Sequence, residues 1–365
     1  MAPPQTPKPL TEGALPHRIY CLLLIGAAYA CVVGFGLYGR QFEPLTGDLT
    51  RIGWFAENEF GGMLPQQRFA PPLAPAASLD GSYDIIAVGD SFTAEEYNPG
   101  TAWPQALARD TGLAVGVFDS GVDSFERVLG SKSYREHPPA ALVYEVVERS
   151  LVPRHRGGDP QSCVATIATP KPRLAIAPLA VVPQTVTRPT TRPWDDWPSS
   201  YAMNFILQNT LRWWRGHEAT AAVRLEMTTD GLFSSRHSRG LLVYAEDFNK
   251  ANWSEGDWRA AICDLARMQD RVQANGRTVF LAMIVPDKLT VYAPFLPDRR
   301  FATLSHLDRL AEIPSVNLVR VDRVLDPRSH VDLYLPNDTH WSSATHAMAA
   351  DLVLRALVEQ GIARQ

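Results

Sequence analysis

Cysteine is scarce in this sequence, and its few cysteines do not form a metal-binding pattern. The chain has 4 cysteines among 365 residues and no C-x-x-C or similar spacing, so we predict no metal and no cofactor. Cys21 and Cys31 fall in an apolar run near the N-terminus, which leaves Cys163 and Cys263 for the rest of the chain. In an oxidising compartment these two could form a disulfide, and two separately buried thiols are the alternative.

A strong excess of either charge is also missing. The formal net charge is -4, which gives no electrostatic reason to expect a nucleic acid as partner. Internal repeats are absent as well. The hydrophobic share of 45% is enough for a sizeable core, and the length suits one large domain or two small ones.

Charged residues are absent from positions 19–38, in the run "IYCLLLIGAAYACVVGFGLY". This length matches the roughly 20 apolar residues that cross a bilayer. Lys8 and Arg18 precede the run and favour a cytoplasmic N-terminus, with the body of the protein outside the inner membrane. A cleaved signal peptide is the alternative, since "AYA" at 28–30 is typical of a cleavage site, but the apolar run continues beyond it and favours an anchor.

The chain therefore divides into four parts. We predict a cytoplasmic tail over residues 1–17, a transmembrane anchor over 18–40, a lead-in and linker over 41–80, and one folded domain over 81–365. Within the domain, short apolar runs ended by turn residues alternate with amphipathic helical patterns. This alternation predicts an α/β fold with a mostly parallel sheet covered on both faces.

The alternation breaks between about 152 and 240, where proline and threonine are frequent. We interpret this stretch as an insertion that forms a lid or a partner surface, with a linker as the alternative. Its one helical pattern carries Trp213 and Trp214, and we expect at least one of these to pack in a core.

The stretch "IIAVGDSF" predicts a buried strand that runs into a Gly-Asp-Ser turn and the start of a helix. Ser91 would then stand at the carboxyl end of a strand, where open α/β sheets bind ligands. Its backbone N–H would point toward a negative charge formed nearby, as an oxyanion requires. The alternative is an ordinary turn in which the serine caps a helix.

The stretch "NDTHW" supplies what a nucleophilic serine needs. His340 is a candidate base, and Asp338, two residues before it, can fix the orientation of the imidazole. The alternative is that Asp338 caps the following helix and His340 only packs. If Ser91, His340 and Asp338 meet, they form a Ser–His–Asp triad for acyl transfer.

These two motifs resemble the SGNH hydrolase superfamily, which has a flavodoxin-like sheet. The D-T-H-W form resembles the branch that contains the periplasmic alginate O-acetyltransferases. The segments "GDLTRIGWFAENEFGG", "VYEVVER" and "VPDKLTVY" agree with it, so the resemblance covers roughly 45–150 and 240–355. In some alginate enzymes the acid–histidine motif precedes the serine, whereas here the serine comes first, as in ordinary SGNH hydrolases.

The resemblance implies roles for further residues. It makes Ser91 the nucleophile and, with Gly121 of "DSGVDS", a source of oxyanion-hole N–H groups. The family's third block normally supplies an asparagine, but this chain has "YEVVERS", which places Glu148 or Arg149 there.

Four residues in or beside these motifs are candidate substrate contacts, and Arg149 is one of them. Lys288 and Tyr292 follow a strand end and could contact a sugar or its carboxylate, or they could be a solvated lysine and a packed tyrosine. Trp341 could stack on a sugar ring or only form a wall of the pocket.

The sequence and the resemblance together predict a membrane-anchored periplasmic O-acetyltransferase that acts on an exopolysaccharide. The resemblance implies an acetyl donor, a polysaccharide acceptor and an integral membrane O-acyltransferase as partners. An esterase or deacetylase with the same triad is the second hypothesis. A carbohydrate-binding or scaffold protein without activity is the third, favoured by the missing asparagine.

Overall fold

The structure is a computed structural model, and it describes residues 14–40, 47–69, 73–74, 76–94, 100–159, 161, 163–186, 200–216 and 220–364. Most of the predicted tail, parts of the linker and residues 187–199 of the insertion lie outside the described residues. The chain forms two compact units. One contains residues 1–43 and 191–217, and the other contains residues 44–190 and 218–365.

The larger unit is built on a five-stranded parallel sheet, as the sequence predicts. The strand order across the sheet is β10-β9-β4-β2-β3. If these five strands are renumbered 1 to 5 along the chain and the sheet is read from β3, the order is 2-1-3-4-5, as in flavodoxin. The strands are β2 (Ile85–Gly89), β3 (Val115–Asp119), β4 (Ala141–Val147), β9 (Val279–Val285) and β10 (Leu318–Val319). Every residue of β2, β4 and β9 is buried, which accounts for their continuous apolar sequences.

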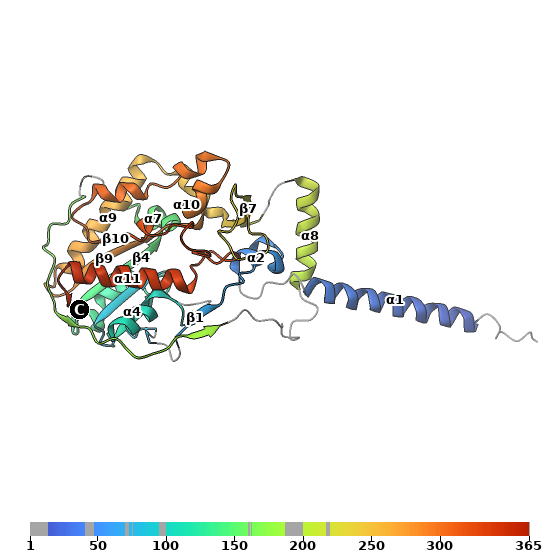
Figure 1. The fold of residues 1–365 in the computed structure, drawn as a ribbon, viewed down its shortest axis with the longest axis horizontal. Coiled ribbons are helices and arrows are strands. Elements are labelled where there is room, and N and C mark those ends of the chain that lie inside the picture. The colour runs from blue at the N-terminus through green and yellow to red at the C-terminus, as the bar shows by residue number, and fades with distance from the viewer. Residues whose placement is uncertain are drawn as a thin grey trace, which may run out of the picture. The chain divides into compact units, whose positions relative to one another are not determined.

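Helices cover both faces of this sheet (Figure 1). One face packs against α4 (Trp103–Thr111) and α11 (Ser343–Glu359), and the other packs chiefly against α9 (Glu255–Gln273). The second face is also covered by α5 (Phe125–Gly130), α6 (Lys132–Arg135) and α7 (Glu148–His155). Alternate side chains of each strand enter the two cores, as the pleat requires.

Shorter elements surround the sheet. Three two-stranded pairings are β1 with β6, β5 with β11, and β7 with β8, and the first and second tie residues 174–186 of the insertion to the larger unit. The bounds are β1 (Gln66–Arg68), β5 (Leu174–Ala175), β6 (Gln184–Val186), β7 (Ala222–Glu226), β8 (Gly240–Tyr244), β11 (Ala363–Arg364), α2 (Asp48–Gly53), α3 (Glu57–Phe60) and α10 (Lys288–Tyr292). The described part of the unit also has 3₁₀ segments at Ala245–Asn252, Ala293–Phe295, Arg299–Thr303, Leu307–Glu312 and Val321–Arg323.

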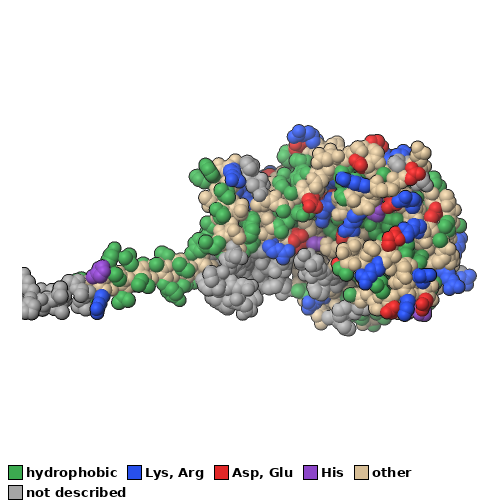
Figure 2. Space-filling model, turned by 180° about the vertical axis from the view of Figure 1, so that it is seen from behind, with side chains coloured by type: hydrophobic (Ala, Val, Ile, Leu, Met, Phe, Trp, Pro, Cys, Tyr) green, Lys and Arg blue, Asp and Glu red, His purple; other side chains and the backbone are tan. Residues whose placement is uncertain are grey.

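The smaller unit consists of α1 (Ala14–Arg40) and α8 (Ser200–Arg215), which contact each other. Within α1, residues 16–38 are long and apolar enough to cross a membrane, although a signal sequence has the same properties. Figure 2 shows hydrophobic side chains along both helices. Trp213 and Trp214 are 85% and 76% exposed, so the prediction that at least one of them packs in a core is wrong.

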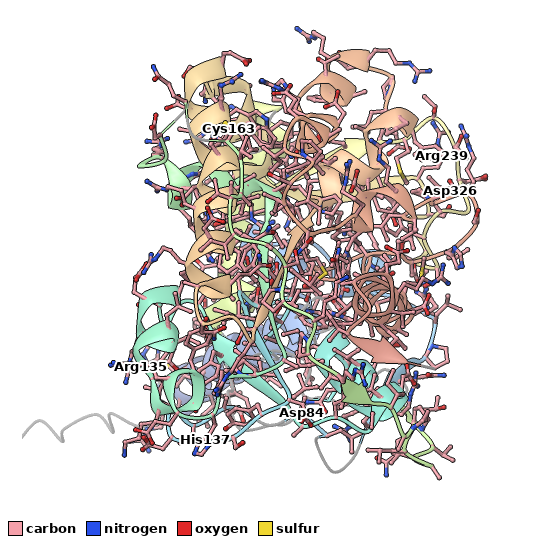
Figure 3. The ribbon with its side chains drawn as sticks, turned by 90° about the vertical axis from the view of Figure 1, so that its left-hand side faces the viewer. Asp84, Arg135, His137, Cys163, Arg239 and Asp326 are labelled. Atoms are coloured by element: carbon pink, nitrogen blue, oxygen red, sulfur yellow. A yellow bond between two sulfur atoms is a disulfide. The ribbon has the colours of Figure 1, made fainter. Side chains whose placement is uncertain are left out.

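The parallel strands give the sheet two chemically different edges. Asp84 and His137 precede β2 and β4, and Figure 3 shows them at the same end of the domain, where these strands begin. The segments that follow the strands, at the opposite edge, contain Ser91, Arg149 and Lys288. The sheet order also places a switch point between β2 and β4, which is where such sheets bind ligands.

A disulfide joins Cys163 to Cys263 across 100 residues of sequence. Cys263 is buried in α9, and Figure 3 shows Cys163 beside that helix. Of the two alternatives that the sequence left open, the structure has the bonded pair. The bond fixes the start of the insertion to the helical face of the sheet.

Removal of this disulfide should destabilise the domain. For Cys163→Ala with Cys263→Ala we expect a loss of about 2–5 kcal/mol in the free energy of unfolding, because the unfolded chain regains the freedom of a long loop. Urea unfolding of the full chain in detergent measures it, with Cys21→Ala and Cys31→Ala as the control pair. A wild-type protein whose unfolding does not respond to reductant would contradict the bond.

Candidate active site

Ser91 lies in the turn that follows β2. The backbone N–H groups of Thr93 and Ala94 both donate to the carbonyl oxygen of Asp90, at 2.9 Å each, so residues 90–94 form a single helix-like turn. The Asp90 carboxylate accepts from the N–H of Phe92 at 3.2 Å and from that of Val147 at 3.2 Å. These bonds tie the turn to the end of β4 and leave the Ser91 side chain partly exposed.

His340 and Asp338 meet this serine. The Nε2 atom of His340 lies 2.6 Å from Ser91 Oγ, and its Nδ1 atom lies 2.6 Å from Asp338 Oδ1. Phe92, the residue after the serine, packs on the imidazole with ring centroids 5.0 Å apart. The structure therefore brings together the three residues that the sequence proposed as a triad, although Ser91 and His340 are 249 positions apart in the sequence.

Lys288 holds the loop that carries His340. Its Nζ atom donates to the carbonyl oxygens of Leu335, Pro336 and Asp338, at 2.8, 2.9 and 3.0 Å. An ammonium group has three protons, so these carbonyls use all of them. Lys288 is 1% exposed, which means that the predicted contact with substrate is wrong. Burial lowers the pKa of Lys288 to about 7, while the three acceptors require the protonated form.

A second carboxylate at this site was missed in the sequence. The backbone N–H of Asp48, at the start of α2, donates to Asp338 Oδ2 at 3.1 Å. The Asp48 carboxylate accepts from the N–H of Thr339 at 2.8 Å and from its hydroxyl at 2.5 Å, and lies 3.8 Å from His340 Nδ1. The only available signal was that "GDLTRIGW" resembles the family's lead-in.

Residues 49–57 of the lead-in also form hydrogen bonds with Asn337, in the loop that carries His340. The N–H groups of Leu49 and Thr50 donate to the carbonyl oxygen of Asn337, at 3.1 and 3.3 Å. The amide of Asn337 donates to Glu57 Oε1 at 2.8 Å, and Glu57 is fully buried. Residues 47–60 are therefore part of the site, whereas the sequence predicted only a lead-in and linker.

The surroundings of Asp338 and Asp48 shift the pKa values of these two carboxylates in opposite directions. Burial would raise the pKa of Asp338, but the charge of His340 and its hydrogen bonds lower it to about 2. Burial and repulsion by Asp338 raise the pKa of Asp48 to about 6. Burial opposes the charging of His340, but the two carboxylates outweigh it and raise its pKa above the ordinary value. Asp338 is thus the ionised partner of the imidazole across the neutral pH range.

Gly121 does not offer the predicted oxyanion-hole donor. Its N–H donates to the side chain of Asp119 at 2.7 Å, so that group is already used. The carbonyl oxygen of Gly89 accepts from the N–H of Ser120 at 2.7 Å, so the neighbouring N–H is engaged as well. Among the described residues, the Ser91 N–H has no acceptor in the structure, and it remains a candidate donor.

Arg149 lies in a largely buried ionic network at the ends of β4 and β9. Its Nη1 atom is 3.1 Å from Asp287 Oδ1 and 3.5 Å from Asp247 Oδ1. Burial opposes its charge, but these carboxylates raise the pKa of Arg149. Its own charge in turn acts to lower the pKa of His340. The role of Arg149 in substrate binding stays a prediction.

Tyr292 and Trp341 are both buried. Tyr292 is fully buried and packs against Phe233 in a tilted arrangement, with ring centroids 4.6 Å apart. Trp341 is 1% exposed and packs edge-on against Phe92 at 5.1 Å. The predicted sugar contacts of both residues are therefore wrong, and the alternative of a packed tyrosine describes Tyr292.

The side-chain atoms of Asp48, Asp338 and His340 lie within 4.8 Å of one another, a spacing that could suit a metal ion. Each group, however, already has hydrogen-bond partners within the loop, including the 2.6 Å bond between Asp338 and His340. These bonds account for the arrangement without an ion.

The larger unit thus has a flavodoxin-like sheet with a serine, a histidine and an aspartate joined at its carboxyl edge. Residues 239–365 match a protein-family model described as the SGNH hydrolase-like domain of the acetyltransferase AlgX, which confirms the predicted resemblance over that part of the chain. The matched residues include His340 and Asp338 and do not include Ser91. No curated protein and no solved structure matches.

The raised pKa of Asp48 predicts a pH-dependent stability. Between about pH 4 and 6 the folded chain holds a proton on Asp48 that the unfolded chain releases, so the free energy of unfolding falls as pH rises. Asp48→Asn should remove that fall, which is at most about 3 kcal/mol. Urea unfolding across this pH range measures it, with exposed Asp230→Asn as the control. If the free energy of unfolding changed equally with pH in the wild type and in Asp48→Asn, the raised pKa of Asp48 would be contradicted.

Lys288→Met should damage the site through its loop. The change leaves three buried carbonyls without their donor, and each such group costs about 1–3 kcal/mol. We expect lower stability in urea and a fall in kcat, with little change in KM. Exposed Lys132→Met is the matched control. If Lys288→Met keeps its stability and kcat but has a higher KM, the result would favour the original prediction that Lys288 contacts the substrate.

Proposed function

We propose that this chain is a membrane-anchored O-acetyltransferase that acetylates an exopolysaccharide through an acyl-enzyme on Ser91. The observation that carries the proposal is the hydrogen-bonded series from Ser91 Oγ through His340 to Asp338, with 2.6 Å at each step. This is the geometry that a serine needs to become a nucleophile. The family match to an acetyltransferase domain favours acetyl as the transferred group.

The first half-reaction would load the enzyme. Ser91 Oγ attacks the carbonyl carbon of an acetyl donor and passes its proton to Nε2 of His340. Asp338 stays ionised and stabilises the imidazolium that forms. When the tetrahedral intermediate collapses, the bond to the donor's leaving group breaks and the leaving group takes the proton from His340. The product is acetyl-Ser91.

The second half-reaction would use the same groups in reverse. A sugar hydroxyl gives its proton to His340 Nε2 and attacks the acetyl carbonyl carbon. Collapse of the second intermediate releases the acetylated sugar, and Ser91 recovers its proton from the imidazolium. Water in place of the sugar hydroxyl would give free acetate, which is the esterase reaction.

The oxyanion would be stabilised differently from the family pattern. The N–H of Ser91 is one donor, and the N–H of Gly121 would have to leave Asp119 to be a second. Arg149 occupies the segment where the resemblance places an asparagine, and its charge acts to lower the pKa of His340. We propose that its guanidinium supplies part of the missing stabilisation, since charged donors act strongly in a partly buried site.

The proposed location is the outer face of the inner membrane, with α1 as the anchor. The disulfide is consistent with an oxidising compartment. The acetyl donor would be supplied by an integral membrane O-acyltransferase, a partner suggested by the resemblance to the alginate enzymes.

The experiment is to supply 4-nitrophenyl acetate with and without uronic-acid and neutral oligosaccharides and to measure acetate and acetylated sugar. We expect an added acceptor to divert product from acetate to acetylated sugar. Ser91→Ala should lower both by on the order of 10⁴-fold or more, because the nucleophile of the triad is gone. Neighbouring Ser120→Ala is the control and should change the rate little.

The alternatives give different results in the same assay. Acetate as the product with every acceptor would favour the esterase. A Ser91→Ala variant that turns over at the wild-type rate would remove any chemical role for this serine and leave the scaffold protein.

A further inference from the structure

Helix α8 carries an exposed apolar face. Met203, Leu207 and Trp214 are 59%, 52% and 76% exposed, and with Thr210 they are spaced by four, three and four residues. That spacing places them on one side of the helix. Trp213, which is 85% exposed, extends the face at the C-terminal end. Soluble proteins rarely leave contiguous large apolar side chains in water.

The charge of α8 suits an anionic surface. Arg212 and Arg215 lie in its last turn, beside the two tryptophans, and its sequence from Ser200 to Arg215 contains no acidic residue. Helices that combine apolar, aromatic and basic residues in this way bind at the boundary between lipid headgroups and acyl chains. Tryptophan is enriched at that depth because its ring is apolar and its N–H is polar.

The partner of α8 within its unit indicates which surface it meets. α8 contacts α1, whose residues 16–38 could cross a bilayer. Within this unit α8 runs transverse to α1, as Figure 1 shows. A helix transverse to a membrane-spanning helix lies parallel to the membrane surface. An apolar side on such a helix can enter the lipid while the arginines reach the phosphates.

We propose that α8 is an interfacial helix that lies on the same bilayer as α1 crosses. Its face of Met203, Leu207, Trp213 and Trp214 enters the headgroup–acyl boundary, and Arg212 and Arg215 bind anionic lipid phosphates. This assigns a membrane contact to the insertion, for which the sequence left a lid, a partner surface or a linker open. The proposal does not depend on the chemistry of Ser91.

The test places a photoreactive p-benzoylphenylalanine at one position of the full chain, reconstituted in phosphatidylethanolamine–phosphatidylglycerol vesicles. The positions are Trp214 on the apolar face, Gln208 on the polar flank of the same helix, and Leu23 in α1. We expect lipid adducts at 214 and 23 and far fewer at 208. A protein adduct at 214, or equal lipid labelling at 214 and 208, would overturn the proposal. A lack of lipid adduct at 23 would also overturn it, because α1 would then not be in the bilayer.

The charge is tested with Arg215→Gln in the same reconstitution, with the photoreactive residue at 214. One basic residue near an anionic surface contributes about fivefold to binding. We therefore expect the ratio of docked to undocked α8, read from the lipid adduct, to fall about fivefold in vesicles with phosphatidylglycerol. In phosphatidylcholine vesicles the variant and the wild type should be equal. If the adduct yield is the same with both lipids and in both proteins, the anionic-lipid part of the proposal is overturned. These readouts need no acetyl transfer, so they fail or succeed separately from the proposed function.

Discussion

The hydrogen bond between Asp338 and His340 is the interaction on which the rest of the site depends. Both groups are buried, and a charged pair loses hydration when it leaves water, so it needs excellent geometry and further hydrogen bonds. The structure supplies them from two directions. The N–H of Asp48 binds the carboxylate from the N-terminal side of the domain, and the Lys288 ammonium binds the loop's carbonyls from the end of β9. The loop is thereby fixed in the shape that presents His340 to Ser91.

A second buried ionic network holds the strand ends beneath this loop. Lys250 donates to Glu148 and Asp287 at 3.1 and 2.5 Å, and Arg149 joins it through Asp287. Burial, with the neighbouring Asp287, raises the pKa of Asp247 to about 7, which reduces the excess of negative charge at neutral pH. The network ties the ends of β4 and β9 together. It also holds the guanidinium of Arg149, whose charge acts to lower the pKa of His340.

Much of the fold could be predicted from the sequence because its signals are local. Buried parallel strands are continuous apolar runs, and helices such as α9 have amphipathic spacing and a serine cap, Ser254. The Ser91, Asp338 and His340 motifs could be paired because the D-T-H-W and G-D-S-F patterns are distinctive. The burial of three candidate substrate contacts could not be predicted. Lys288, Tyr292 and Trp341 follow strand or loop ends as ligand-binding residues do, but burial depends on distant packing that spacing does not encode.

The role of residues 47–60 escaped prediction for a related reason. Asp48 and Asp338 are 290 positions apart, and nothing in the local pattern of either segment indicates the other. The contact has a consequence for the anchor. α1 ends at Arg40 and α2 begins at Asp48, so residues 41–47 are the whole connection and can extend by about 25 Å at most. A single covalent segment therefore joins the candidate membrane span to a residue that hydrogen-bonds the triad. Under the proposed function, an anchor attached in this way would limit how far Ser91 can travel from a membrane protein that supplies acetyl groups.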